Sequence, residues 1–244
     1  MLPPLPSLSQ AALAFSFLAS TIGTYFACRQ PNPNPNPPTR SKSDSLTTCH
    51  ITDKHATKIM LSPLGLLTLL SARLAYLYPA LPPNQCRHLN PDLVTWSPST
   101  AIPLALILCV GVPLRLASYA SLGKNFTFAL AEPDRLKTTG LYRYVQHPSY
   151  TGVVVLIFCN IALMARVDGV VSCWASERWY KWLRDLGWSL APVGVSVVLG
   201  AVWTRVRQEE EMLRTKFGGE WEGWHSRTAR CIKLVRSFAL IRVN

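Results

Sequence analysis

Long uncharged runs alternate with short polar segments along the chain. Five runs carry at most one charged residue each and reach the roughly 17 to 25 residues that a helix needs to cross a bilayer. They are residues 1–28, of which Leu8–Ala27 is the most apolar part, Ile59–Leu81, Leu93–Leu114, Pro148–Ala165 and Leu186–Thr204. Prolines at 63, 103, 113 and 192 fall inside these runs, and membrane helices tolerate proline because neighbouring groups satisfy the freed backbone. The pattern therefore predicts an all-α, polytopic integral membrane protein with about five transmembrane helices.

Composition supports the membrane class. Charged residues make up 16% of the 244 residues, well below the roughly 25% typical of soluble domains. A cleaved secretory signal is the alternative interpretation of the first run, but residues 1–28 lack a basic segment at their start and a persuasive cleavage site. We predict an uncleaved first span over 1–28, a disordered Pro/Asn-rich linker over 29–58 and one membrane domain over 59–244.

The distribution of positive charge sets the expected orientation. The net charge is +12, and the segments between spans hold 18 Lys and Arg residues on one side and five on the other. Positive loops face the cytosol, so residues 29–58, residues 122–149 and the tail from residue 205 are predicted to be cytosolic, with the N-terminus outside. Topology thus explains the basicity, and nucleic acid is not required as a partner.

Cysteine spacing indicates neither a metal site nor a disulfide framework. The seven cysteines include no C-x-x-C pair and show no regular spacing. Cys86 and Cys173 both fall on the predicted non-cytosolic side, and we treat a disulfide between them as one possibility.

Two polar segments flank the fourth and fifth runs. The first, "RLKTTGLYRYVQHPSYTG", places Pro148 in a first helical turn, so that free backbone donors lie beside His147, Ser149 and Tyr150. If the fourth and fifth spans form a hairpin, this segment meets the second one, "RVRQEEEMLRTKFGGEWEGWH", on the same side of the membrane. One pocket for a polar ligand could then draw on both segments.

The second segment begins with charges at the membrane boundary, where an unpaired charge is costly. A helix continuing from the fifth span puts Arg205 and Glu209 four residues apart on one face. Apolar residues then recur at four, four and three residues. This spacing, over Leu213, Phe217, Trp221 and Trp224, predicts a cytosolic C-terminal helical cap that presses back over the pocket.

These segments resemble one family. Over about residues 115–232, "LGKNFTF", then "LKTTGLYRYVQHPSYTG", then R-x-x-x-E-E-x-x-L-x-x-x-F-G-x-E-W-x-x-W resemble the isoprenylcysteine carboxyl methyltransferase family of integral membrane enzymes, and we predict the catalytic part of the chain over 115–235. The resemblance implies S-adenosylmethionine as methyl donor, a prenylated cysteine carboxylate as acceptor, a lipidated substrate that enters from the bilayer, and an endoplasmic reticulum location. It implies that Arg205 receives the acceptor carboxylate. The cofactor contacts that it implies are Asp134, Arg135, Leu136, Lys137, Tyr142, His147, Pro148, Ser149, Tyr150, Glu209 and Glu210, with no metal.

The sequence departs from the family pattern at a few positions. Gln146 replaces the usual basic residue before His-Pro, Trp221 and Trp224 replace tail tyrosines, and Thr228-Ala229 replaces a terminal Val-Pro. The chemistry agrees with the assignment, because a carboxylate is already a nucleophile at neutral pH and needs no general base. Three alternatives stay open: phospholipid N-methylation, an NADPH-dependent sterol reductase, and a non-catalytic membrane scaffold. The oligomeric state also stays open.

Overall fold

The computed structural model describes residues 7–32, 56–78, 80 and 86–230. Its long helices are α1 (Leu8–Cys28), α3 (Ala56–Leu77), α6 (Pro148–Met164) and α7 (Glu177–Phe217). A further continuous stretch consists of α4 (Pro98–Leu106), the π-helical turn η2 (Ile107–Gly111) and α5 (Val112–Leu122). The short α8 (Gly219–His225) follows α7. The described residues contain no strand, and their remaining regular elements are the 3-10 turns η1 (Pro91–Leu93), η3 (Gly123–Asn125), η4 (Gly140–Arg143) and η5 (Val170–Cys173).

Each of the five predicted spans corresponds to a helix. Four stretches are long and apolar enough to cross a membrane: Leu8–Cys28, Ala56–Leu77, Pro91–Asn125 and Glu177–Phe217. α6 is a shorter apolar helix of 17 residues. The prediction of an all-α membrane protein is therefore confirmed, whereas most of the predicted 29–58 linker lies outside the described residues.

The boundaries of two predicted spans were wrong. The third was predicted over Leu93–Leu114, but the helix begins after Ser97, whose side chain caps it, and extends to Leu122, where Gly123 takes a φ of 55°. The fifth was predicted over 186–204, but α7 runs for 41 residues. Strong helix formers follow its apolar part, and a positive φ at Gly218 is what ends it.

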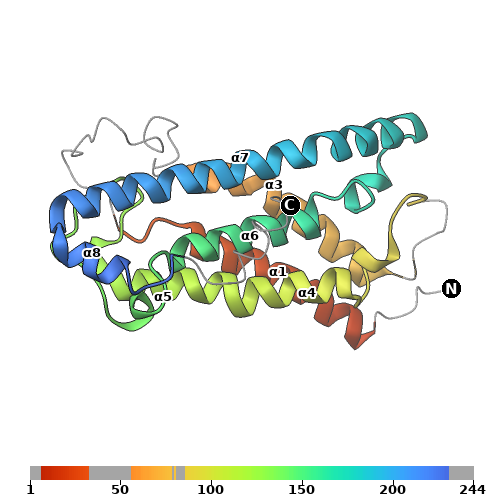
Figure 1. Cartoon of the computed structure of the whole chain (residues 1–244). Coiled ribbons are helices and arrows are strands. Elements are labelled where there is room, and N and C mark those ends of the chain that lie inside the picture. Colours follow the sequence, from red (N-terminus) through yellow and green to blue (C-terminus); the bar gives the residue numbers. More distant parts are fainter. Residues whose placement is uncertain (1–6, 33–55, 79, 81–85, 231–244) are drawn as a thin grey trace.

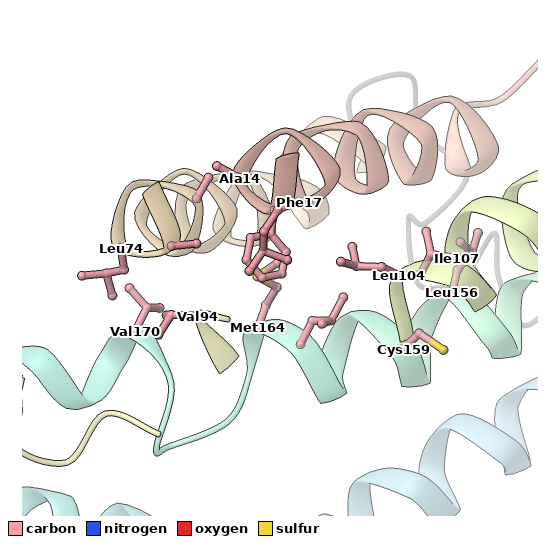
Figure 2. Close-up of a cluster of buried hydrophobic side chains, with 14 of the residues drawn as sticks. Ala14, Phe17, Leu74, Val94, Leu104, Ile107, Leu156, Cys159, Met164 and Val170 are labelled. Carbon is pink, nitrogen blue, oxygen red and sulfur yellow. The ribbon is translucent and has the colours of Figure 1, made fainter. Parts of the chain in front are cut away.

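Helices α1, α3, α4, α5 and α6 pack into a bundle. Its core holds buried apolar side chains from α1, α3, α4, η2 and α6, among them Phe17, Leu104 and Leu156 (Figure 2). Two glycines allow α6 to approach the preceding helical stretch closely. A Cβ on Gly152 would lie 2.9 Å from Cγ of Arg115 and 3.0 Å from the carbonyl oxygen of Gly111. The close approach places Arg115 of α5 against the first turn of α6.

α7 runs along one side of this bundle (Figure 1). The apolar middle of α7 is exposed, with Trp188 and Val197 at 78% and 65% relative exposure. The buried residues of α7 are Arg205, Val206, Glu210 and Leu213, all in its last third. The helix therefore presents an apolar surface suited to lipid, and its buried contacts with the rest of the molecule lie near its C-terminal end.

The two ends of the molecule differ in chemistry. A disulfide joins Cys86 to Cys173 at one end, which confirms the pairing considered from the sequence. At the same end Arg166 and Asn90 both bind Asp168, with distances of 2.7 Å and 3.0 Å to its Oδ2. The loop between α5 and α6 lies at the opposite end, together with α8 (Figure 1).

Candidate active site

A cavity of about 440 Å³ lies beside the first half of α6, whereas Cys173 of the disulfide follows the other end of this helix. The walls of the cavity come from α5, the loop after α5, η4, the first half of α6 and the C-terminal part of α7, with further residues from α1, α3 and α8. Nine of the site residues named from the sequence line it: Arg135, Leu136, Lys137, Tyr142, His147, Ser149, Tyr150, Arg205 and Glu209. The two polar segments are therefore brought into one pocket, as the hairpin argument predicted.

The other three residues do not line the cavity. Asp134 is exposed and pairs with Lys124, with 3.3 Å between Oδ2 and Nζ. Pro148 is fully buried as the first residue of α6, where its missing N–H costs no hydrogen bond. Glu210 is buried behind the cavity wall, in a polar cluster described below.

Arg205 and Glu209 face the cavity one helical turn apart. Arg205 is 5% exposed, and its Nη2 donates a hydrogen bond of 2.5 Å to the carbonyl oxygen of Phe128. Tyr150 hydrogen-bonds through its side chain to both Glu209 and Arg205. Glu209 is more accessible, with 31% of its side chain exposed. The arrangement places one cation and one anion side by side in the same pocket.

His147 connects the start of α6 to both glutamates of α7. Its Nε2 lies 3.4 Å from Oε1 of Glu210, and its Nδ1 lies 3.9 Å from Oε2 of Glu209. Nε of Arg230 lies 3.0 Å from the same Oε1 of Glu210. Glu210 thus holds His147 and Arg230 together, while Glu209 remains directed at the cavity.

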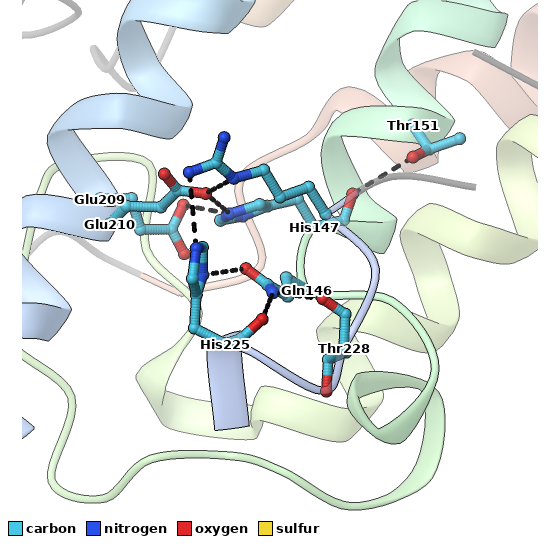
Figure 3. A network of polar contacts seen from close by, with 8 residues as sticks. Gln146, His147, Thr151, Glu209, Glu210, His225 and Thr228 are labelled. Carbon is cyan, nitrogen blue, oxygen red and sulfur yellow. Dashed lines mark hydrogen bonds and ion pairs between the residues drawn. The ribbon is translucent and has the colours of Figure 1, made fainter. Parts of the chain in front are cut away.

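The chain after α8 closes this end of the molecule through a set of contacts that we call the C-terminal latch, residues 225–230 bound to residues 145–147 (Figure 3). Backbone N–H groups of Gln146 and His147 donate to the carbonyls of Ala229 and Arg230, at 2.8 Å and 3.1 Å. Nε2 of Gln146 donates to the carbonyls of His225 (3.0 Å) and Thr228 (2.5 Å). Oε1 of Gln146 then accepts a hydrogen bond of 2.8 Å from Nδ1 of His225.

Electrostatics fix the protonation of two groups in this region. Burial raises the pKa of the Tyr142 phenol, and the charge of Glu209 raises it further, so the phenol stays a hydrogen-bond donor. Burial lowers the pKa of His225, and the nearby positive charge of Arg230 adds to this against the opposing attraction of Glu210. His225 is therefore neutral at pH 7, with its proton on Nδ1 facing Gln146.

Aromatic residues of α8 hold the latch over the cavity. Trp224 lines the cavity and donates from Nε1 to the carbonyl of Tyr142 at 2.9 Å. Trp221 is buried and stacks on His225, with 4.3 Å between ring centroids. Leu213 of α7 is buried in the same cluster. The recurring apolar residues after Glu209 thus bring α8 back over the pocket.

Sequence reasoning missed Arg115. This residue lines the cavity, is 6% exposed, and donates from Nη1 to Oγ of Ser149 at 2.5 Å. Its guanidinium also lies 5.7 Å from the ring centroids of both Phe126 and Phe128. The only signal in the sequence was that Arg115 directly follows the uncharged run Leu93–Leu114, which is about long enough to cross a bilayer. An arginine in that position is usually interpreted as a helix-end anchor at the lipid headgroups.

Comparison with known proteins supports a family. Residues 104–181 match the model of the isoprenylcysteine carboxyl methyltransferase (ICMT) family. No curated protein and no solved structure matches the chain. The match supports the family assignment made from the motifs, and with it an enzyme like the isoprenylcysteine carboxyl methyltransferases. The matched segment contains His147 and Tyr150 but ends before Arg205 and Glu209. Arg205 and Glu209 are therefore assigned to the site because they line the same cavity.

Proposed function

We propose that the protein uses S-adenosylmethionine to methylate the carboxylate of a prenylated cysteine. One observation carries this proposal: a single cavity combines a buried arginine and an accessible glutamate with an apolar wall formed by membrane-level residues. That wall includes Val153 and Ile157 of α6 and Ala201 and Val202 of α7. The charged carboxylate and the apolar chain of a prenylated cysteine can therefore occupy the cavity together.

The residues present fit the cofactor. The cavity volume of about 440 Å³ falls within the roughly 300–1,000 Å³ typical of small-molecule sites. Glu209 supplies an accessible carboxylate for the ammonium group of the cofactor's amino-acid part. Tyr142, His147, Ser149 and Tyr150, with the loop from residue 135 to residue 137, complete the proposed contacts. When bound, S-adenosylmethionine supplies a methyl group whose bond to the positively charged sulfur breaks as the bond to the acceptor oxygen forms.

Arg205 is the proposed partner of the acceptor carboxylate. Its guanidinium offers several donors in a planar fork that matches a carboxylate. The Tyr150 hydroxyl, hydrogen-bonded to both Arg205 and Glu209, fixes the two side chains relative to each other. Because a carboxylate needs no deprotonation, the task of these residues is to orient it and to keep water out.

The prenyl chain is proposed to enter from the bilayer. The apolar middle of α7 is exposed, and the cavity wall begins where that stretch ends, at Ala201 and Val202. A lipid chain lying against α7 would reach the cavity without crossing a polar surface. Membrane lipids are the expected surroundings of the same face.

The protein is proposed to lie in the endoplasmic reticulum membrane, with its cavity facing the cytosol. Disulfides persist in oxidising compartments, and the Cys86–Cys173 disulfide lies at the end opposite the cavity. This argument is independent of the distribution of Lys and Arg, which predicts the same orientation.

Methyl transfer in membranes containing the protein tests the proposal. Labelled S-adenosylmethionine would be supplied with either a farnesylcysteine analogue or phosphatidylethanolamine. We expect label in the farnesylcysteine analogue, in a product that base hydrolyses as it does an ester. Label in phosphatidylethanolamine alone, in a base-stable product, would establish the N-methylation alternative instead. Absence of transfer to either acceptor would overturn the proposed function.

A further inference from the structure

Arg115 is a buried cation whose charge no carboxylate balances among the described residues. Every side-chain contact of its guanidinium is to a neutral group: the carbonyl of Ala27, Oγ of Ser149 and three aromatic rings. By contrast Glu210, a buried carboxylate that does not line the cavity, is paired with Arg230 at 3.0 Å. Burying an unbalanced charge is costly, so a position of this kind in a membrane domain indicates a binding role.

The Arg115 guanidinium has a structural role on the side that faces α1. Nε of Arg115 donates to the carbonyl of Ala27 at 3.0 Å, and the hydroxyl of Tyr119 donates to the same carbonyl. Ala27 lies in the last turn of α1, where carbonyls lack intrahelical partners and the helix dipole is negative. The dipole balances only about half a charge, so an electrostatic demand for an anion remains.

The other side of the guanidinium faces the cavity beside the start of α6. Its Nη1 donates to Ser149, whose hydroxyl hydrogen is then free to point to a ligand. Ser149 is the second residue of α6, so backbone N–H groups without helical partners lie next to this hydroxyl. A guanidinium, a hydroxyl and a helix start together favour a carboxylate or similar anion.

Glu209, which lines the same cavity, indicates what kind of ligand carries that anion. Glu209, Arg115 and Tyr142 all line the same cavity, and the charges of Glu209 and Arg115 act in opposite directions on the pKa of the Tyr142 phenol. An amino-acid group carries its ammonium and its carboxylate on the same carbon and therefore needs an anion and a cation near each other. Glu209 and Arg115 provide that pair within one cavity.

We propose that Arg115, together with the hydroxyl of Ser149, binds the α-carboxylate of the cofactor's amino-acid part. This inference rests on the proposed function, because it takes the ligand to be S-adenosylmethionine. It separates the two buried arginines of the cavity: Arg115 serves the cofactor, and Arg205 serves the acceptor.

Binding of two ligands that differ only in the carboxylate tests the inference without relying on turnover. The full-length protein in detergent would be titrated by calorimetry with S-adenosylhomocysteine and with its decarboxylated analogue. Arg115→Gln should weaken S-adenosylhomocysteine binding about tenfold or more and change the affinity of the analogue by no more than about twofold, since only one ligand has the charged hydrogen bond to lose. Ser149→Ala should show the same selectivity with a smaller loss, and it decides the question if Arg115→Gln does not fold.

Tyr119→Phe is the matched control. It removes the other hydrogen bond to the carbonyl of Ala27 and keeps the charge of Arg115, so it should leave the preference between the two ligands unchanged. Equal losses for both ligands in Arg115→Gln would mean that the residue only anchors α1, and unchanged binding of both would remove it from the site. Either result, or a wild-type protein that does not discriminate between the ligands, overturns the inference. Arg115→Gln and Ser149→Ala could both lose the preference for S-adenosylhomocysteine over its decarboxylated analogue while the wild-type protein methylates no prenylcysteine. That result would uphold the inference and reject only the proposed acceptor.

Discussion

Replacing Gln146 by alanine should open the C-terminal latch. The side chain of Gln146 makes three hydrogen bonds across the latch, two as donor to the carbonyls of His225 and Thr228 and one as acceptor from Nδ1 of His225. Gln146→Ala removes all three and leaves the backbone bonds of the latch in place. The variant therefore isolates the side-chain contribution.

The expected size follows from those three bonds. Each contributes about 0.5–1.5 kcal/mol net, and Gln146 is 3% exposed, so water does not replace them in the closed state. We expect the free energy of opening to fall by about 2–4 kcal/mol. Because 1.4 kcal/mol is a factor of ten, amides protected by the latch should exchange about 30 to 1,000 times faster.

Hydrogen exchange read by mass spectrometry measures this directly. Peptides covering residues 140–150 and 222–230 should gain deuterium faster in Gln146→Ala, whereas peptides from α1 should not change. Thr215→Ala is a suitable control, because it deletes an exposed hydroxyl that bonds only to the carbonyl of Glu211 within α7. If exchange in both peptides stayed at the wild-type rate, the packing of α8 alone would hold the latch and our reasoning about Gln146 would be wrong.

Three further predictions address the acceptor site, the disulfide and the helix packing. Arg205→Lys should reduce kcat/KM for a farnesylcysteine analogue by about 1–3 kcal/mol of transition-state binding while the affinity for S-adenosylhomocysteine stays unchanged; wild-type kinetics would show that Arg205 only anchors α7. Cys86→Ser should lower the free energy of unfolding in detergent by about 2–4 kcal/mol, and Cys109→Ser, which deletes a free thiol, should not, so equal melting temperatures for the two variants would contradict a stabilising disulfide. Gly152→Ala should cost about 1–3 kcal/mol, since its Cβ would meet atoms at 2.9 and 3.0 Å, whereas Gly194→Ala, with no atom within 4 Å of its Cβ, should be neutral in the same melting assay.

Much of the fold could be predicted because a membrane span is identified from the length and the lack of charge of one continuous segment. Uncharged runs of sufficient length identified five helices, and helical spacing placed Arg205 and Glu209 on one face. The ends of the helices were less predictable. α7 continues through charged residues that are good helix formers, and charge marks the end of an apolar run rather than the end of a helix. The π-helical turn before α5 has no comparable signal, because Ile107–Gly111 reads as ordinary apolar helix.

The candidate site was predictable only where its residues belong to recognisable motifs. Arg115 belongs to none: its importance depends on α1 and α6 packing against it, and such contacts cannot be read from spacing. Gln146 is the converse case, since the sequence showed only that a basic residue was replaced. The structure gives the physical reason, because a group that donates to two carbonyls and accepts from His225 must have both kinds of atom, and a lysine or arginine has no acceptor.

The two proposed arginine roles together bear on the choice of acceptor. With the cofactor's carboxylate on Arg115 and its ammonium on Glu209, the charges that remain in the buried part of the cavity are those of Arg205 and the sulfonium, both positive. An ammonium acceptor such as phosphatidylethanolamine would add a third positive charge in a buried site, where charges interact strongly. A carboxylate instead balances Arg205 and brings a negative oxygen beside the sulfonium. Methylation then converts both the carboxylate and the sulfonium into neutral groups, so the ester loses its attraction to Arg205 and the same electrostatics that favour binding also favour release.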